Sequence, residues 1–202
     1  MQTMQHKTGA AVESGFDPIP TRIREVPPLI IEKQDGSMKQ QVTGHLRQLA
    51  TQLAHVHRAA AEAYLSQAMY GEALPHAEAA ATFDLDNAEY QNQLGFIRYI
   101  LGDDAGAIAC FEKVLAEHPA QPDALFNLGM VRFGCNDVQA AEQCFSGCLA
   151  AIPNDAETWN NRGVCLHRMG RIEDARICFQ RALQIDPTNQ DAKINLAAAP
   201  SR

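Results

Sequence analysis

The sequence predicts an all-α protein in which helix-turn-helix units stack into an α-solenoid. Two observations support this fold class. Residues 88–189 contain three segments that align at a period of 34 residues without an insertion. Within each segment, apolar residues recur at spacings of three and four, which indicates two amphipathic helices. Because a single helix pair cannot bury its apolar face, neighbouring pairs must stack.

Four columns of this alignment hold one residue type in all three segments. Glycine and alanine occupy two of them, and such small residues let two helices approach closely. Proline ends each segment, because it cannot continue a helix. Short polar stretches with Gly or Asn separate the helices, as is typical of chain reversals. The columns are Gly95, Gly129 and Gly163; Ala107, Ala141 and Ala175; Phe111, Phe145 and Phe179; and Pro119, Pro153 and Pro187.

The start of the chain differs from the repeated part. Pro18, Pro20, Pro27 and Pro28 exclude a helix through most of it. We expect residues 1–36 to form an extended or disordered tail. The alternative is a strand or segment that docks on the repeats.

A long helix is expected to follow, with residues 37–53 as an N-terminal capping helix. Its apolar residues alternate spacings of four and three, which is a short heptad-like seam. One interpretation is that the seam packs on the first repeat. The other is self-association, although two heptads are marginal for an isolated coiled coil. The seam consists of Val42, Leu46, Leu49, Leu53 and Val56.

The repeat domain is expected to cover residues 54–202. A weaker copy of the pattern precedes the three clear ones, with Ala61 in the glycine column, Ala73 in the alanine column and Leu85 in the proline column. The pattern restarts after the last copy and then ends at Pro200. The expected parts are a degenerate repeat at 54–87, repeats at 88–121, 122–155 and 156–189, and a C-terminal capping helix at 190–199.

This pattern resembles the tetratricopeptide repeat family over roughly residues 54–189. One departure is Arg162, which stands where that unit usually carries Leu. The resemblance implies a right-handed superhelix of antiparallel helix pairs with a concave groove, and binding of a protein or peptide rather than catalysis. The residues that carry it in the best copy are Trp159, Gly163, Ala175, Phe179, Ala182 and Pro187.

In that family the first helix of each unit lines the concave face. Carried over by position, the resemblance implies an apolar and aromatic groove in this chain. An exposed strip of this kind marks a partner site. The alternative is that some of these side chains fill the groove against the tail or the terminal helix. The implied groove residues are Asn92, Phe96, Tyr99, Ile100, Phe126, Met130, Phe133, Asn160, Val164, His167 and Arg168.

The last repeat is rich in arginine. Guanidinium groups hold carboxylates well, so a ligand would meet an apolar middle and a basic C-terminal end. We therefore expect a protein or peptide partner that is apolar and has an acidic end. The residues concerned are Arg162, Arg168, Arg171, Arg176 and Arg181.

Composition and terminal sequence exclude other partners. A formal net charge of −7 argues against binding to nucleic-acid phosphates, which needs a surplus of Lys and Arg. No apolar run approaches the ~20 residues of a membrane helix. The first residues lack the basic start and apolar core of a secretory signal. We expect no membrane insertion, and a cytoplasmic location with reduced thiols.

Catalytic and metal-binding patterns are also missing. The sequence contains no G-x-S-x-G, no H-E-x-x-H and no glycine-rich phosphate loop. His55 and His57 are two residues apart, so on a helix they face different directions. Cys110, Cys144 and Cys178 share one column directly before the phenylalanines, which predicts small core residues rather than zinc ligands. We expect no enzyme activity, no metal and no cofactor.

The leading hypothesis for function is a cytoplasmic adaptor that binds an apolar or amphipathic peptide segment of a partner protein in the concave groove. Two alternatives stay open. One is a chaperone similar in size and layout to the class II chaperones of bacterial type III secretion. The other is a structural scaffold that self-assembles through its N-terminal helix or tail.

Overall fold

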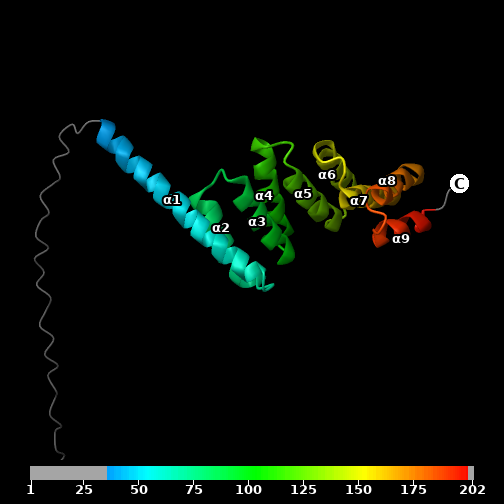
Figure 1. Cartoon of the computed structure of the whole chain (residues 1–202), viewed down its shortest axis with the longest axis horizontal. Helices are drawn as coiled ribbons and strands as arrows, with labels where there is room; N and C mark the ends of the chain where they lie inside the picture. The colour runs from blue at the N-terminus through cyan, green and yellow to red at the C-terminus, as the bar shows by residue number, and fades with distance from the viewer. Residues whose placement is uncertain (1–35, 200–202) are drawn as a thin grey trace, which may run out of the picture. The chain divides into compact units, whose positions relative to one another are not determined.

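The computed structural model describes residues 36–199, and every regular element in that range is an α-helix (Figure 1). The expected all-α fold class is confirmed. The expected tail lies outside the described residues, except that Gly36 begins the first helix. The helices are α1 (Gly36–Leu65), α2 (Tyr70–Phe83), α3 (Ala88–Ile100), α4 (Asp104–Glu117), α5 (Pro122–Gly134), α6 (Val138–Ala151), α7 (Ala156–Arg168), α8 (Ile172–Ile185) and α9 (Gln190–Ala198).

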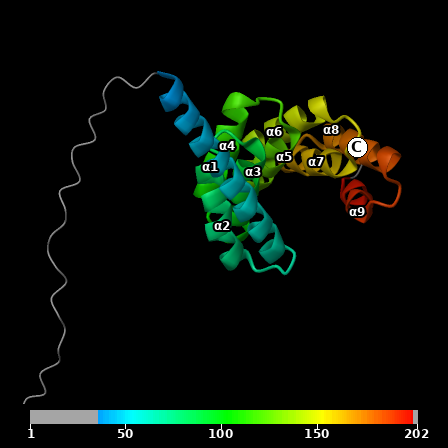
Figure 2. The same ribbon diagram turned by 60° about the vertical axis from the view of Figure 1, so that its left-hand side comes forward.

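The described residues divide into two units between Val42 and Thr43, inside α1, and the second unit holds residues 43–199. In the second unit, successive helices pack as pairs: α3 with α4, α5 with α6, and α7 with α8. One pair packs on the next through α4 with α5 and α6 with α7. In the view of Figure 2, α4, α6 and α8 lie above α3, α5 and α7. This is the array of stacked helix pairs that the repeat period predicts.

The glycine and phenylalanine columns meet inside each helix pair. All three phenylalanine rings are buried. A Cβ atom built on each glycine would approach the facing ring more closely than real Cβ atoms do. Glycine is therefore required for the ring to lie against the first helix. The distance from the added Cβ to Cε1 of the facing ring would be 2.7 Å for Gly95 and Phe111, 2.7 Å for Gly129 and Phe145, and 2.5 Å for Gly163 and Phe179.

A second set of residues, also 34 apart, turns the chain between the two helices of each pair. Gly102 and Gly170 have φ values of 83° and 76°, and Asn136 has 64°. Glycine adopts this left-handed region without cost, and asparagine tolerates it. In the degenerate first repeat the same place is taken by Ala68, with φ 56°. Alanine is strained there, because its Cβ crowds the backbone.

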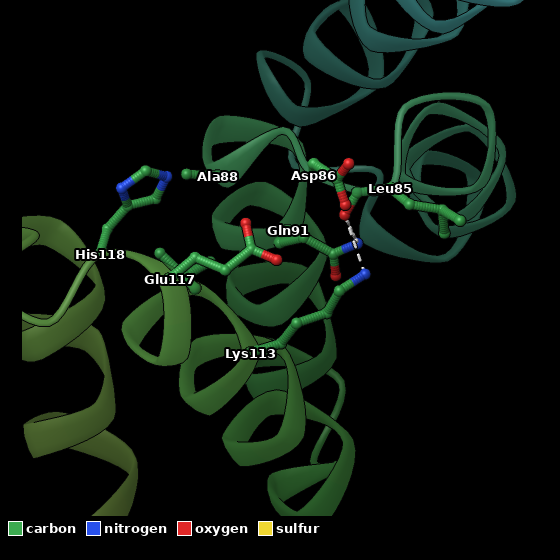
Figure 3. A pocket seen from close by; sticks show the side chains of 8 residues that line it. Leu85, Asp86, Ala88, Gln91, Lys113, Glu117 and His118 are labelled. Carbon is green, nitrogen blue, oxygen red and sulfur yellow. Dashed lines mark hydrogen bonds between the residues drawn. The ribbon is translucent and has the colours of Figure 1, made fainter.

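The first repeat lacks the proline that ends the others and carries Leu85 instead. The Leu85 carbonyl accepts hydrogen bonds from Lys113 Nζ at 2.8 Å and from Gln91 Nε2 at 3.4 Å (Figure 3). These contacts tie the α2–α3 connection to α3 and α4. The cavity beside them measures about 10 Å³, which is the space of a single water molecule. It is a structural junction rather than a ligand site.

The apolar seam of α1 is exposed. Its side chains retain between 44% (Leu53) and 65% (Val56) of their surface. The seam therefore does not pack on the first repeat. The core there instead contains Ala54 and Ala61 of α1, which are fully buried together with alanines of α2 and Tyr90 of α3.

Candidate functional site

The residues expected in the groove lie on α3, α5 and α7, which are the first helices of their pairs. α3 also contacts α5 directly, so first helices are neighbours. On α5 the predicted residues are spaced by four and three and share one face. The assignments are Asn92, Phe96, Tyr99 and Ile100 on α3; Phe126, Met130 and Phe133 on α5; and Asn160, Val164, His167 and Arg168 on α7.

These residues differ in how much of each side chain is free. Phe96 and Ile100 are 38% and 43% exposed, and His167 and Arg168 are exposed too. The three α5 residues are half-buried and pack on Phe145 of α6. The ring of Phe126 meets the ring of Phe145 edge to face, with their centres 5.9 Å apart. The α5 residues thus belong partly to the core and partly to the surface.

Asn160 and Tyr99 are largely committed to the fold. Asn160 is buried, and its Oδ1 accepts a hydrogen bond of 2.8 Å from Asn195 Nδ2 of α9. This amide is joined to the terminal helix, as the alternative interpretation expected for some groove residues. The half-buried Tyr99 packs on the cluster around Ala107 and Phe111.

An apolar pocket opens between α5 and α7. It has a volume of about 60 Å³ and is lined by Met130, Phe133, Phe145, Asn161 and Val164. The single polar side chain in this set is Asn161, whose Nδ2 donates to Met130 Sδ at 3.6 Å. We call this cavity the apolar pocket.

Asn161 lines the apolar pocket but was not among the predicted groove residues. The repeat register could have indicated this position, because it directly follows the predicted groove residues Asn92, Phe126 and Asn160. Gln93, Asn127 and Asn161 are 34 residues apart, so each first helix carries an amide at the same place. A side-chain amide both donates and accepts hydrogen bonds, and so can pair with a peptide backbone.

A wider hollow of about 290 Å³ lies next along α5. Three carboxylates line it. Asp155 caps α7 by accepting from the backbone N–H groups of Glu157 and Thr158, at 3.3 Å each. Asp123 and Glu157 do not cap helices and are exposed. We call this cavity the acidic hollow; its lining residues are Pro122, Asp123, Phe126, Asn127, Cys148, Ile152, Asp155 and Glu157.

The five arginines of the last repeat do not converge on the groove face. Arg162 Nε bonds Glu142 Oε1 at 2.8 Å, and Arg171 pairs with Asp174 at 2.7 Å. Arg176 donates to the Ala199 carbonyl, and Arg181 donates to Gln184 Oε1 at 3.1 Å. Arg168 alone among the five stacks on a predicted groove residue, with its guanidinium 4.3 Å from the centre of the Phe133 ring.

Two family models match this array. Both describe the tetratricopeptide repeat, one over residues 100–162 and the other over residues 156–189. The matched stretch contains the glycine–phenylalanine contacts of α5–α6 and α7–α8. Residues 100–189 of the chain are tetratricopeptide repeats.

Solved structures of this fold are similar to the chain at low sequence identity. MamA residues 41 to the end from Desulfovibrio magneticus RS-1 superimposes with a TM-score of 0.69 at 24% identity, covering 73% of this chain and 83% of that one. YrrB, described as a tetratricopeptide repeat protein with an unusual peptide-binding site, gives 0.63 at 19%, covering 78% and 87%. The first such domain of Spaghetti (RPAP3), bound to the HSP90 peptide SRMEEVD, gives 0.54 at 21%, covering 55% and 89%. No curated protein sequence matches the chain.

Arg162, which stands where the repeat usually carries Leu, forms an ion pair with Glu142 of the preceding tetratricopeptide repeat. Leu94 and Leu128 hold the same place in their repeats and are buried. Arg162 keeps 25% of its side-chain surface and Glu142 of α6 keeps 14%. An arginine is accommodated at this apolar position because a largely buried carboxylate faces it.

Four of the six cysteines of the repeats lie in the core, as predicted for Cys110 and Cys178, whereas Cys135 is exposed. Cys110, Cys148, Cys165 and Cys178 are buried free thiols, whereas Cys144 is half-buried. Burial raises the pKa of Cys165 to about 12 and that of Cys178 to about 11. Such thiols stay protonated and unreactive at neutral pH.

Residues 36–199 hold no group of three or more side chains suited to a metal ion.

His55 and His57 of α1 face different directions, as expected from their spacing. His55 Nδ1 is 2.8 Å from Tyr90 Oη of α3, whereas His57 Nδ1 is 3.0 Å from His76 Nδ1 of α2. The His76 ring also stacks on Tyr64, with centres 5.6 Å apart. The pairing of His57 with His76 was not predicted.

Among the helices of residues 36–199, none is both long and apolar enough to cross a membrane.

Proposed function

We propose that this tetratricopeptide repeat protein is a non-catalytic, cytoplasmic adaptor that binds an apolar or amphipathic peptide segment of a partner protein along α3, α5 and α7. The observation that carries the proposal is the apolar pocket among Met130, Phe133, Phe145 and Val164. Exposed Phe96 and Ile100 extend the apolar surface onto α3. Concave sites of this composition suit a side chain that is anchored by burial.

Further support comes from the fold. The RPAP3 domain is described as bound to a peptide, and YrrB as having a peptide-binding site. At the C-terminal end of α7, Arg168 supplies a guanidinium that an acidic group of the ligand can pair with. A class II-like secretion chaperone would use the same surface for a secreted protein, so it differs from the adaptor only in its partner.

Selection of peptides from a random display library on the full chain tests this function. The affinity of a selected, fluorescein-labelled peptide is then measured by anisotropy with Val164→Met, which fills the apolar pocket with a flexible apolar side chain. Binding should weaken about tenfold, which corresponds to about 1.4 kcal/mol. Ile177→Met is the matched control, because Ile177 is 61% exposed on α8 and lies outside the pocket. Equal affinity for the wild type and Val164→Met would refute the proposal.

Self-assembly is a second candidate, favoured by the exposed apolar seam of α1. Leu46, Leu49 and Leu53 face solvent, and a helix with such a stripe gains by burying it. Sedimentation across a range of concentration should show a multimer for the wild type and a monomer for Leu46→Glu/Leu49→Glu. Gln48→Glu/Gln52→Glu places the same charges on exposed polar positions of α1 and serves as the control. A wild-type monomer at all concentrations would eliminate the scaffold.

A further inference from the structure

The geometry points to the class of peptide that this surface accepts: an extended segment in which a small aliphatic residue fills the apolar pocket and a Lys or Arg two positions away reaches the acidic hollow. This inference rests on the proposed function and adds a sequence preference to it. Its basis is the placing of the two cavities on one face of α5.

The size of the apolar pocket determines which ligand side chain it can hold. On the scale where one water needs about 10–15 Å³, the pocket's 60 Å³ has room for about four to six heavy atoms. The three or four carbons of Val, Ile or Leu side chains fit this space, whereas the indole of Trp does not. Four of the five lining side chains are apolar, so a polar side chain entering there would lose its water without gaining partners.

The charge of the acidic hollow sets the second residue. Asp123 and Glu157 approach it from α5 and α7, and Asp155 adds a third carboxylate from the start of α7. Among residues 36–199 no ion pair involves these three side chains. A Lys or Arg of the ligand would therefore pair with carboxylates that have no cationic partner among residues 36–199. A ligand carboxylate would be repelled here and would fit only at the opposite end, beside Arg168.

The spacing follows from the register of α5. Phe126 borders the acidic hollow and Met130 borders the apolar pocket. Four residues of helix advance about 6 Å. In an extended peptide, side chains on one face repeat every second residue, at about 6.6 Å. The two distances match, so an aliphatic residue at position i places residue i+2 or i−2 at the hollow.

The amides supply what an extended backbone needs. Asn127 lines the acidic hollow and Asn161 lines the apolar pocket. Each can donate to and accept from the main chain of the ligand, whose N–H and C=O groups lose water on binding. A strand-like occupant is favoured over a helical one, because a helix satisfies these groups itself.

Peptide selection on three versions of the full chain tests the inference. Wild type should enrich peptides that carry Val, Ile or Leu with Lys or Arg two residues away. Val164→Met should lose the aliphatic preference. Asp123→Lys/Glu157→Lys should retain the aliphatic preference and replace Lys or Arg with Asp or Glu. Asp155 is left unchanged because it caps α7.

The outcomes separate this inference from the function on which it rests. If wild type enriches no peptide, both fail. If it enriches apolar peptides without a basic preference, or if the charge-reversed variant selects the same peptides as wild type, the inferred preference fails and the binding function stands. Enrichment of helical sequences with heptad spacing, such as that of residues 43–56, would assign the surface to α1 of a second copy and overturn the inference.

Discussion

The guanidinium of Arg168 lies 4.3 Å from the centre of the Phe133 ring and links the C-terminal end of α7 to α5. Phe133 also lines the apolar pocket. The pair therefore forms one border of the surface proposed to bind a peptide. A cation over an aromatic face at an exposed site contributes about 0.5–1 kcal/mol.

Truncation of this pair has a measurable consequence. Arg168→Ala should lower the free energy of unfolding by about 0.5–1 kcal/mol, measured by urea denaturation. In a double-mutant cycle with Phe133→Leu, the same amount should reappear as coupling between the two positions. Arg181→Ala is the control, because Arg181 contacts Gln184 and Asn154 and no ring. Additive single changes would show that the stacking contributes nothing.

The glycine column predicts a sharp contrast between two alanine substitutions. Gly163→Ala places a methyl group 2.5 Å from Cε1 of the buried Phe179 ring, and overpacking of this kind costs about 1–3 kcal/mol. Gly134→Ala, at the end of α5, meets nothing within 4 Å and should be neutral or slightly stabilising. Thermal unfolding of both variants decides the matter. A Gly163→Ala protein as stable as wild type would contradict the close packing of glycine on phenylalanine.

The turn of the first repeat offers a stabilising change. Ala68 has a φ of 56° where the later repeats carry Gly, Asn and Gly. Ala68→Gly should raise the free energy of unfolding by about 0.5–1 kcal/mol, because glycine removes the strain of the left-handed backbone. The same exchange at Ala63, on an exposed face of α1, should lower stability by about 1 kcal/mol. Effects of the same sign at both positions would refute this account.

The buried thiols make stability depend on alkaline pH. The pKa of Cys165 in the folded protein is about 12, raised by burial above its ordinary value of 9.0. A raised pKa means that the folded state holds the proton more tightly, so the stabilisation is complete below pH 9 and is lost between about 9 and 12. The free energy of unfolding should fall as pH rises from 8 to 10.5, and less steeply in Cys165→Ala.

The matched control for this pH profile is Cys135→Ala. Cys135 is exposed, and its pKa is raised less than that of Cys165, so its removal should change the slope of stability against pH less than removal of Cys165 does. Alkylation provides an independent check. Iodoacetamide at pH 8 should modify Cys135 in the folded protein, and the buried thiols only after unfolding. Rapid modification of Cys165 in the native state would contradict its burial.

Much of the fold follows from the repeated columns. The glycine, alanine and phenylalanine positions predicted which helices pair, because a small residue and a ring must meet at the same height in every unit. Cys148 likewise shares a column with Val114 and Ala182, and all three are buried. Predictions of this kind succeed because each column has one local environment that is repeated.

The candidate site was less predictable. The resemblance to the tetratricopeptide repeat family implied that Asn160 and Arg168 both line the groove from α7. In the structure, Asn160 is buried and bonded to Asn195, whereas Arg168 is exposed and stacks on Phe133. Asn161, which borders the apolar pocket, was not predicted to belong to the groove. Whether a side chain is free depends on which neighbouring helix covers it, and a single repeat does not contain that information.

The contrast is clearest in α1. Periodicity alone established the helix pairs, their 34-residue register and the apolar stripe of Leu46, Leu49 and Leu53, because these depend on local spacing. The packed structure decided that this stripe faces solvent while Ala54 and Ala61 are buried. A spacing pattern defines a face of a helix, but only contacts with other helices determine whether that face is covered. The same reason explains the difference between the predicted groove and the two cavities. The groove was inferred from the position of each residue in its repeat, whereas the cavities form only when the helices pack.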